Sequence, residues 1–303
     1  MSLVSARRVG SSLLAAAGLV AALAAPAAAQ DPAPNPNGGN IHISGATDFT
    51  NAYMFRGIRQ DDTKVIVWPY FDLGLGVYSG EGGLKSVGVN FGTWNSVHTG
   101  DAGAKSDVSG LGCACGKAWY ESDFYTTIGF GFGGGTSVGA TYTAYTSPNN
   151  GFSTVKEIAF KAAVDDSAYL HKAAVKPYAL IAFEFDTEPG KGQADGGANA
   201  GKYLEIGAAP GYTGSKAGIS VPVKVGLSVG DYYEDPLTGQ DSTFGYFSVA
   251  GVVTVPFTSV PTKFGTWNVH GGVEFQTYGD SLKTFNNGDS HKTIGSIGIG
   301  FTY

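Results

Sequence analysis

Two cysteines, Cys113 and Cys115, are separated by a single alanine. Two thiolates are too few for a structural zinc site, which takes four ligands. In an oxidising compartment the pair favours a local disulfide, although a bridge between residues this close would be strained. Free or intermolecular thiols are the alternatives. The pair therefore predicts no metal.

Other residue types that could do chemistry lack the spacing that chemistry needs. Neither metal-ligand nor triad spacing occurs among the histidines, which are His42, His98, His171, His270 and His291. Ser290 beside His291 is typical of a polar loop, not of a nucleophile and its base. The run Gly129-x-Gly131-x-x-Gly134 formally matches a dinucleotide fingerprint, but an extended segment follows it where a phosphate-binding helix is needed. We expect no enzyme activity and no cofactor.

An acidic loop contains Asp231, Glu234, Asp235 and Asp241. Carboxylates can bind a divalent cation, but these lack the ordered ligand spacing of a calcium loop. A solvated loop is the better interpretation.

The remaining charged residues of interest lie inside extended segments, at alternate positions opposite the apolar ones. If the apolar parity faces outward, these line an interior: Asp48, Arg56, Asp72, Glu121, Asp123, Glu157, Lys161, Glu184, Glu205, Lys224 and Glu274. Eight acids against three bases would favour cations in a narrow passage. Arg56, Glu121 and Asp123 are expected near its outer mouth. The alternative is a salt-bridged interior that plugs and stiffens the fold.

Strands must position these side chains, because apolar residues alternate with polar ones from Ile41 onward. We predict about twelve strands, near residues 41–56, 65–78, 84–97, 118–132, 136–146, 155–164, 177–186, 202–209, 218–229, 244–257, 266–278 and 292–303. Counting from hairpin centres places Glu157 near Glu184, and Glu205 near Lys224.

The links between these strands alternate in length. Residues 79–83 and 133–135 form short links, whereas residues 98–117 and 233–243 form long polar ones. Short turns at one end, long loops at the other and an even strand count are typical of an antiparallel transmembrane β-barrel of the bacterial outer membrane. Only 15% of residues are charged, against roughly 25% in soluble domains. A secreted β-sandwich is the alternative, since alternation alone suits both folds.

The N-terminal segment has the features of a cleaved export signal. Arg7 and Arg8 precede an apolar stretch, and Ala27, Ala28 and Ala29 offer a cleavage site. We predict a signal peptide over residues 1–29, a flexible lead-in over 30–40 and the barrel over 41–303. Loss of both arginines would change the net charge from −6 to −8. This charge argues against nucleic acid as a partner.

Two segments near the predicted barrel start resemble a known family. Tyr53, Phe55, Arg56 and Gly57 form a Tyr-x-Phe-Arg-Gly segment, and residues 92–96 form a Gly-x-Trp-x-Ser segment. Both resemble the opening of the TorF-like family of outer-membrane porins. The final residue, Tyr303, resembles the terminal aromatic that directs outer-membrane barrels to the barrel-assembly machinery. The resemblance implies a porin fold and function.

These observations predict an outer-membrane channel for passive diffusion of ions and small hydrophilic solutes, with a preference for cations. A barrel of about twelve strands has a backbone diameter of roughly 24 Å and leaves an opening on the order of 10 Å. Inward glycines such as Gly92 and Gly226 are expected to keep it open. The alternatives are a closed structural or adhesive barrel, or a lipid hydrolase with its serine and histidine on the outer wall. Expected partners are outer-membrane lipid, the barrel-assembly machinery and small solutes.

Overall fold

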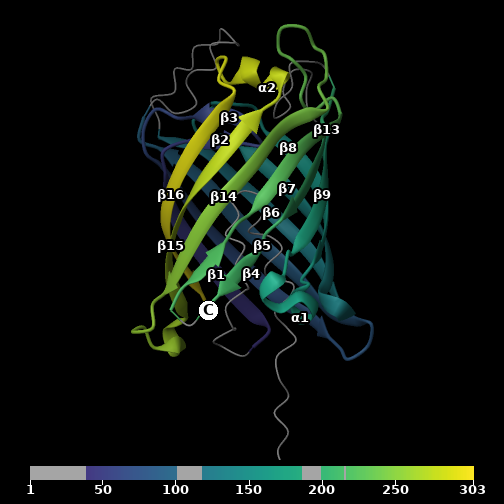
Figure 1. The fold of residues 1–303 in the computed structure, drawn as a ribbon, viewed down its shortest axis with the longest axis vertical. Helices are drawn as coiled ribbons and strands as arrows, with labels where there is room; N and C mark the ends of the chain where they lie inside the picture. The colour runs from purple at the N-terminus through teal and green to yellow at the C-terminus, as the bar shows by residue number, and fades with distance from the viewer. Residues whose placement is uncertain (1–38, 101–117, 186–198, 215) are drawn as a thin grey trace, which may run out of the picture.

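Twelve antiparallel strands form a closed wall in the computed structural model, which describes residues 39–100, 118–185, 199–214 and 216–303 (Figure 1). The wall strands are β1 (Ile41–Thr50), β4 (Ile66–Ser79), β5 (Leu84–His98), β6 (Trp119–Phe132), β7 (Thr136–Thr146), β8 (Val155–Val164), β9 (Pro177–Phe185), β10 (Lys202–Ala208), β13 (Val223–Gly230), β14 (Phe244–Pro256), β15 (Thr266–Tyr278) and β16 (His291–Thr302). The predicted all-β barrel of about twelve strands is confirmed.

The first and last wall strands close the barrel. β1 pairs with β16 in antiparallel register, with Ala46 opposite Gly300. The ladder continues to the last residue, because Ile43 and Tyr303 exchange both backbone hydrogen bonds, at 2.6 and 2.7 Å. Closure leaves no unpaired edge between these two strands.

Two neighbouring wall strands are interrupted by proline. Pro210 separates β10 from β11 (Gly211–Thr213), and Pro222 separates β12 (Gly218–Ser220) from β13. Proline has no backbone N–H to donate to a ladder. Pairing resumes beyond each break, where β11 pairs with β12 and β12 pairs with β14.

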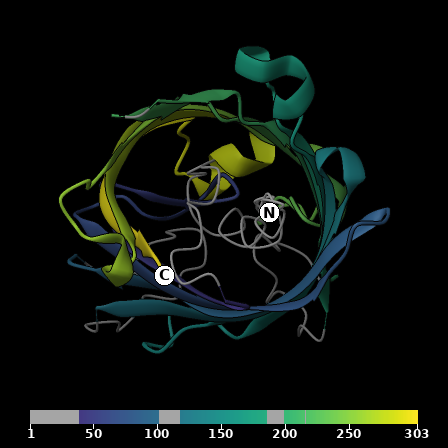
Figure 2. The same ribbon diagram turned by 90° about the horizontal axis from the view of Figure 1, so that it is seen from below.

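The two ends of the barrel differ. The turn end has the short links, Tyr303 and the short helix α1 (Ser167–Leu170), at the bottom of Figure 1. The loop end, at the top, has the described links 51–65, 147–154, 231–243 and 279–290, the last of which contains α2 (Asp280–Phe285). Along the barrel axis, α2 lies within the ring of strands and α1 outside it (Figure 2). In the described part of the chain, no helix is long and apolar enough to cross a membrane.

The wall is apolar outside and polar inside. Large apolar side chains on the outward parity are exposed, such as Phe124 at 57% and Ile297 at 59%. On the inward parity, Glu157, Thr127 and Ser248 are buried. This polarity is the reverse of that in a soluble protein, and it confirms the predicted facing of the strands.

One strand prediction is wrong. The segment 41–56 is not one strand, because the wall strand β1 ends at Thr50 and the chain then turns into the barrel. It forms the hairpin β2 (Tyr53–Phe55) and β3 (Ile58–Asp61), which pair only with each other. The alternation that predicted a continuous strand belongs to two extended pieces, separated at Asn51 and Ala52.

Candidate functional site

The inward hairpin turns at Arg56 and Gly57. Both residues have positive φ, 49° and 83°, and Phe55 pairs with Ile58 across them. A two-residue hairpin loop favours this conformation, and glycine adopts it without strain. Arginine does not, at a cost of about 1 kcal/mol. The sequence Phe-Arg-Gly-Ile was therefore a hairpin signal that the strand pattern concealed.

The hairpin packs its two faces against opposite sides of the barrel. Ala52, Met54 and Ile58 belong to an apolar cluster that includes Leu180 of β9 and Ile294 of β16. On the other face, Tyr53 and Phe55 pack with residues of β4 to β8, namely Ile66, Trp68, Trp94, Tyr120, Tyr145 and Val155. The hairpin thus lies inside the barrel and contacts opposite sides of the wall in the loop half.

Other loop-end segments join the hairpin. Leu282 of α2 and the loop residues Tyr232 and Tyr233 are fully buried in the same cluster. The Asn286 side chain holds the turn, since its Nδ2 donates to Gly57 O at 2.8 Å and its Oδ1 accepts from Arg59 N at 2.9 Å. The hairpin β2–β3, Tyr232, Tyr233, α2 and Asn286 are called the plug below.

A buried ion pair fixes the tip of the plug to the wall. Arg56 Nη1 and Nη2 donate to the two carboxylate oxygens of Glu157 on β8, at 2.6 and 2.9 Å. Nη1 also donates to Tyr232 Oη at 3.0 Å, and the guanidinium lies 4.1 Å from the Tyr203 ring centroid. The expectation of Arg56 as a wall charge at the outer mouth is therefore wrong: it lies on the plug, 8% exposed.

The base of the hairpin is held by a serine–histidine–aspartate relay. Ser96 Oγ and His98 Nε2 are 2.8 Å apart, and His98 Nδ1 lies 2.8 Å from Asp61 Oδ2. The interpretation that no histidine has triad partners is thus corrected; the inward positions 96 and 98 of one strand were its sequence signal. Ser96 is 0% exposed and accepts a hydrogen bond from Trp68 Nε1 at 3.1 Å. Through the contact between His98 and Asp61, the relay joins the plug to β5.

Hydrogen bonds keep the Asp61 carboxyl charged. Burial opposes ionisation, but hydrogen bonds from His98 and Thr63 outweigh it and lower the pKa of Asp61. Thr63 donates from both its backbone N and its Oγ1, at 2.9 and 2.8 Å. Asp61 lies on the plug, outside the membrane-spanning strands.

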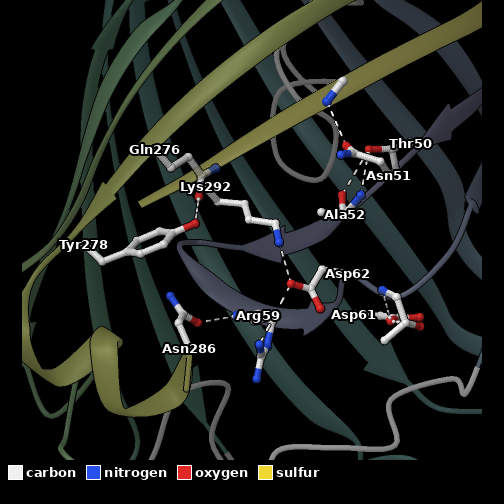
Figure 3. A network of polar contacts seen from close by, with 12 residues as sticks. Thr50, Asn51, Ala52, Arg59, Asp61, Asp62, Gln276, Tyr278, Asn286 and Lys292 are labelled. Carbon is white, nitrogen blue, oxygen red and sulfur yellow. Dashed lines mark hydrogen bonds and ion pairs between the residues drawn. The ribbon is translucent and has the colours of Figure 1, made fainter. Parts of the chain in front are cut away.

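A third polar contact joins the hairpin to β16. Lys292 Nζ donates to Asp62 Oδ2 at 2.5 Å, and Arg59 Nη1 lies 3.9 Å from the same oxygen. Figure 3 shows Lys292 reaching from its strand to Asp62, and Asn286 directed at Arg59. Together with Glu157 and His98, these contacts tie the plug to three separate wall strands.

Most predicted wall carboxylates already have partners. Asp48 Oδ1 lies 2.6 Å from His270 Nε2, and Asp72 accepts from Asn90 at 2.6 Å. Glu274 accepts from Ser248 and Gln276.

The observed cross-strand pairs agree only in part with the pairs predicted from the hairpin centres. Glu157 lies opposite Glu184, as predicted. Glu205 lies opposite Gly226, with Lys224 two residues along β13. Glu184 accepts from Gly201 N at 3.1 Å.

Two predicted residues, Glu121 and Asp123, are buried at 3% and 2%. Both interact with each other beside Tyr53 of the plug. Neither faces open solution at the mouth.

Inward-facing glycines are covered by tyrosine rings from the adjacent strands. A Cβ at Gly92 would lie 2.2 Å from the Tyr125 ring, and one at Gly226 would lie 2.2 Å from the Tyr246 ring. An aromatic ring that lies over a glycine on the adjacent strand covers the backbone there. These glycines therefore do not widen the lumen as expected; they make room for side chains that narrow it.

Some predictions stay outside this description. The signal peptide, most of the lead-in and the Cys113–Cys115 bridge fall on residues beyond the described ranges.

The acidic loop is more ordered than a solvated loop. Asp235 Oδ1 accepts hydrogen bonds from Leu237 N and Thr238 N, and Asp241 Oδ1 accepts one from Tyr233 N. These turns direct Tyr232 and Tyr233 into the lumen. Across the described ranges, no three His, Cys, Asp or Glu side chains are placed to hold a metal ion.

In a closed antiparallel barrel, each wall strand pairs its backbone N–H and C=O groups with those of its neighbours, as a lipid environment requires. The apolar exterior faces the lipid and the polar interior is shielded from it. The chain is an outer-membrane β-barrel protein.

No family model and no curated protein sequence matches the chain. It is similar to the COG4313 outer membrane channel from Pseudomonas putida F1, at 11% identity and a TM-score of 0.46, over 88% of this chain and 96% of that one. It is also similar to the NanC porin, at 10% identity and a TM-score of 0.41, over 86% and 98%. A third similar structure is outer membrane phospholipase A from Escherichia coli, at 11% identity and a TM-score of 0.40, over 86% of this chain and 89% of that one. These three proteins differ in function, so the likeness assigns none.

Proposed function

We propose that this protein is a plugged outer-membrane channel for ions and small hydrophilic solutes. The carrying observation is that the plug is joined to the wall through charged and polar contacts, at Glu157, His98 and Lys292. A filler that served only stiffness would be at least as stable with apolar contacts, because burying an ion pair costs desolvation that its attraction barely offsets. Charged contacts can be hydrated when the plug moves, which suits a gate.

The family resemblance supports the same proposal. Its two motif segments, around Tyr53 and around Trp94, meet in the structure, where the Tyr53 ring centroid lies 5.4 Å from that of Trp94. In the second segment, Ser96 belongs to the relay that anchors the plug. The motif residues would then serve plug docking, and membership of the TorF-like porins is part of the proposal.

The test is conductance of the refolded protein in planar bilayers. In the test variant, residues 53–61 are replaced by a short Gly-Ser link; its control has the same replacement in the loop-end segment 148–153. We expect the plug variant to conduct severalfold better than wild type, toward a pore on the order of 10 Å wide. A variant that shows the heat-dependent gel shift of a folded barrel yet stays non-conducting would favour a closed structural or adhesive barrel.

The same recordings test ion preference. Removal of the hairpin takes Arg56 away and uncovers Glu121, Asp123 and Glu157, so we expect the open pore to prefer cations, most at low salt. The reversal potential across a salt gradient measures it. An anion-selective open pore would contradict this part of the proposal.

A further inference from the structure

The charges of the wall strands are sorted by face. In the described wall strands every carboxylate has the inward parity, namely Asp48, Asp72, Glu121, Asp123, Glu157, Glu184, Glu205 and Glu274. The outward parity of the same strands has basic residues only, which are Lys85, Lys156, Lys202 and His291. A lysine that faces lipid is far less costly near the interface than at the midplane. Each of these four residues accordingly is the first or second residue of its strand.

Two of the outward lysines flank one strand at the loop end. Lys156 of β8 lies opposite Phe185 of β9, and Lys202 of β10 lies opposite Phe183 of the same strand. Two strand spacings and a rise of two residues separate their Cα atoms by roughly 12 Å. Because outer-membrane barrels have their longer loops outside the cell, this end of the wall meets the outer leaflet.

The outer surface on the turn side of these lysines is apolar and aromatic. The ring centroids of Phe160 and Phe183 are 6.4 Å apart, and those of Tyr142 and Phe185 are 6.0 Å apart. These four residues are called the aromatic strip below. Phe160 is 46% exposed on the outer wall. The two lysines therefore stand at the edge of the apolar band, where acyl chains end and lipid headgroups begin.

The neighbouring acids do not neutralise this edge from inside the barrel. Glu157, next to Lys156, faces inward and binds Arg56. Glu184, between Phe183 and Phe185, also faces inward and accepts from Gly201 N. Among the described carboxylates none lies within 4.0 Å of Lys202 Nζ, and this includes Asp231 in the adjoining loop. The outward parity of β7 to β10 thus has a net positive charge.

We propose that Lys156 and Lys202 bind the phosphate groups of an acidic lipid in the outer leaflet, with its acyl chains against the aromatic strip. An ammonium group binds a phosphate as a point charge and offers it three donors. Two ammonium groups on either side of β9 suit a headgroup that has two separate phosphates. This site lies on the outer wall and does not rest on the channel proposed above.

The test is native mass spectrometry of the refolded barrel in neutral detergent at low salt, titrated with diphosphoryl lipid A. We expect saturable binding to the wild type. Lys156→Gln and Lys202→Gln should each weaken it about fivefold, which corresponds to about 1 kcal/mol for one lysine at an anionic lipid surface. The double glutamine variant should weaken it about 25-fold, since the two lysines act on separate phosphates. Replacement of both by arginine should keep binding, because the charge is kept.

The matched control is Lys85→Gln. Lys85 is also an outward lysine near a strand end, but it lies at the turn end of β5, where its Nζ donates to Glu81 O at 2.8 Å. Its substitution should leave lipid A binding unchanged. Monophosphoryl lipid A should bind the wild type about fivefold more weakly than the diphosphoryl form. Inorganic phosphate alone should not saturate the site, because it leaves the aromatic strip uncovered.

Three results would overturn the lipid site. They are the absence of saturable lipid A binding to the wild type, equal binding to a double glutamine variant that shows the heat-dependent gel shift of a folded barrel, and an equal loss in Lys85→Gln. Saturable binding of inorganic phosphate as tight as that of lipid A would show a free-anion site and overturn the lipid as its occupant.

Discussion

The loop half and the turn half of the lumen are built by the same strands and differ in what fills them. In the loop half, the wall residues Tyr203 and Tyr246 are fully buried against the plug. In the turn half, Lys161, Tyr178 and Lys224 on the same inward parity are partly exposed. A barrel wall therefore does not determine how open its lumen is. Loop-end links that fold back inside do.

The largest expected effect comes from breaking the ion pair that holds the plug. Arg56→Met leaves the Glu157 carboxylate buried without its partner, and loss of one member of a buried pair costs about 3 to 5 kcal/mol. The loop half should then hydrate and resemble the turn half. Hydrogen exchange of the hairpin amides measures this. The control is Arg56→Met with Glu157→Leu, which should recover most of the protection; equal loss in both variants would contradict the assigned role.

A smaller effect is expected from the turn itself. Gly57→Val places a β-branched side chain at a φ of 83°, with a Cβ 2.7 Å from Leu282 Cδ1. Strain and overpacking together should cost about 2 to 4 kcal/mol of plug docking. Limited proteolysis of the hairpin in a folded barrel tests this. Gly239→Val is the control, because Gly239 also has positive φ but its Cβ would meet nothing within 4 Å. Similar cleavage in both variants would argue against a docked turn.

The smallest expected effect is a weakening of plug docking at low pH, when Asp61 becomes protonated. The pKa of Asp61 is lower in the folded protein than in the unfolded chain, where it is about 4. Its ionised carboxylate therefore stabilises plug docking above about pH 4, and this stabilisation is lost as the pH falls through the folded pKa. His98 and Tyr120 are titratable groups that face it. Hairpin protection should therefore fall in acid, and Asp61→Asn should reduce that slope. An unchanged slope in Asp61→Asn would assign the acid effect to other groups.

Prediction from sequence succeeded where one local rule decides the outcome. Alternation placed Phe124 and Ile297 outside and Glu157 inside, because a period of two fixes the face of every residue in a strand. It failed at residues 51–61, where the same period continues through a hairpin that leaves the wall. Arg56 was assigned to the lumen by parity, but its partner Glu157 is 101 residues away, and no local pattern pairs them.

The relay shows the same limit. Ser96 and His98 could be seen to share a face of one strand, but Asp61 reaches them only because the hairpin folds inward.

The sequence by itself predicted a barrel of alternating strands with a polar interior and an apolar exterior, because the period of two, the low charge and the alternating link lengths together favour it over a β-sandwich. Only the tertiary structure decided that a hairpin folds into the loop half of the interior and that Lys161 and Lys224 lie in the turn half. Which carboxylates are neutralised depends on contacts between segments far apart in the chain. Those contacts exist only once the wall has closed and the links have a lumen to enter.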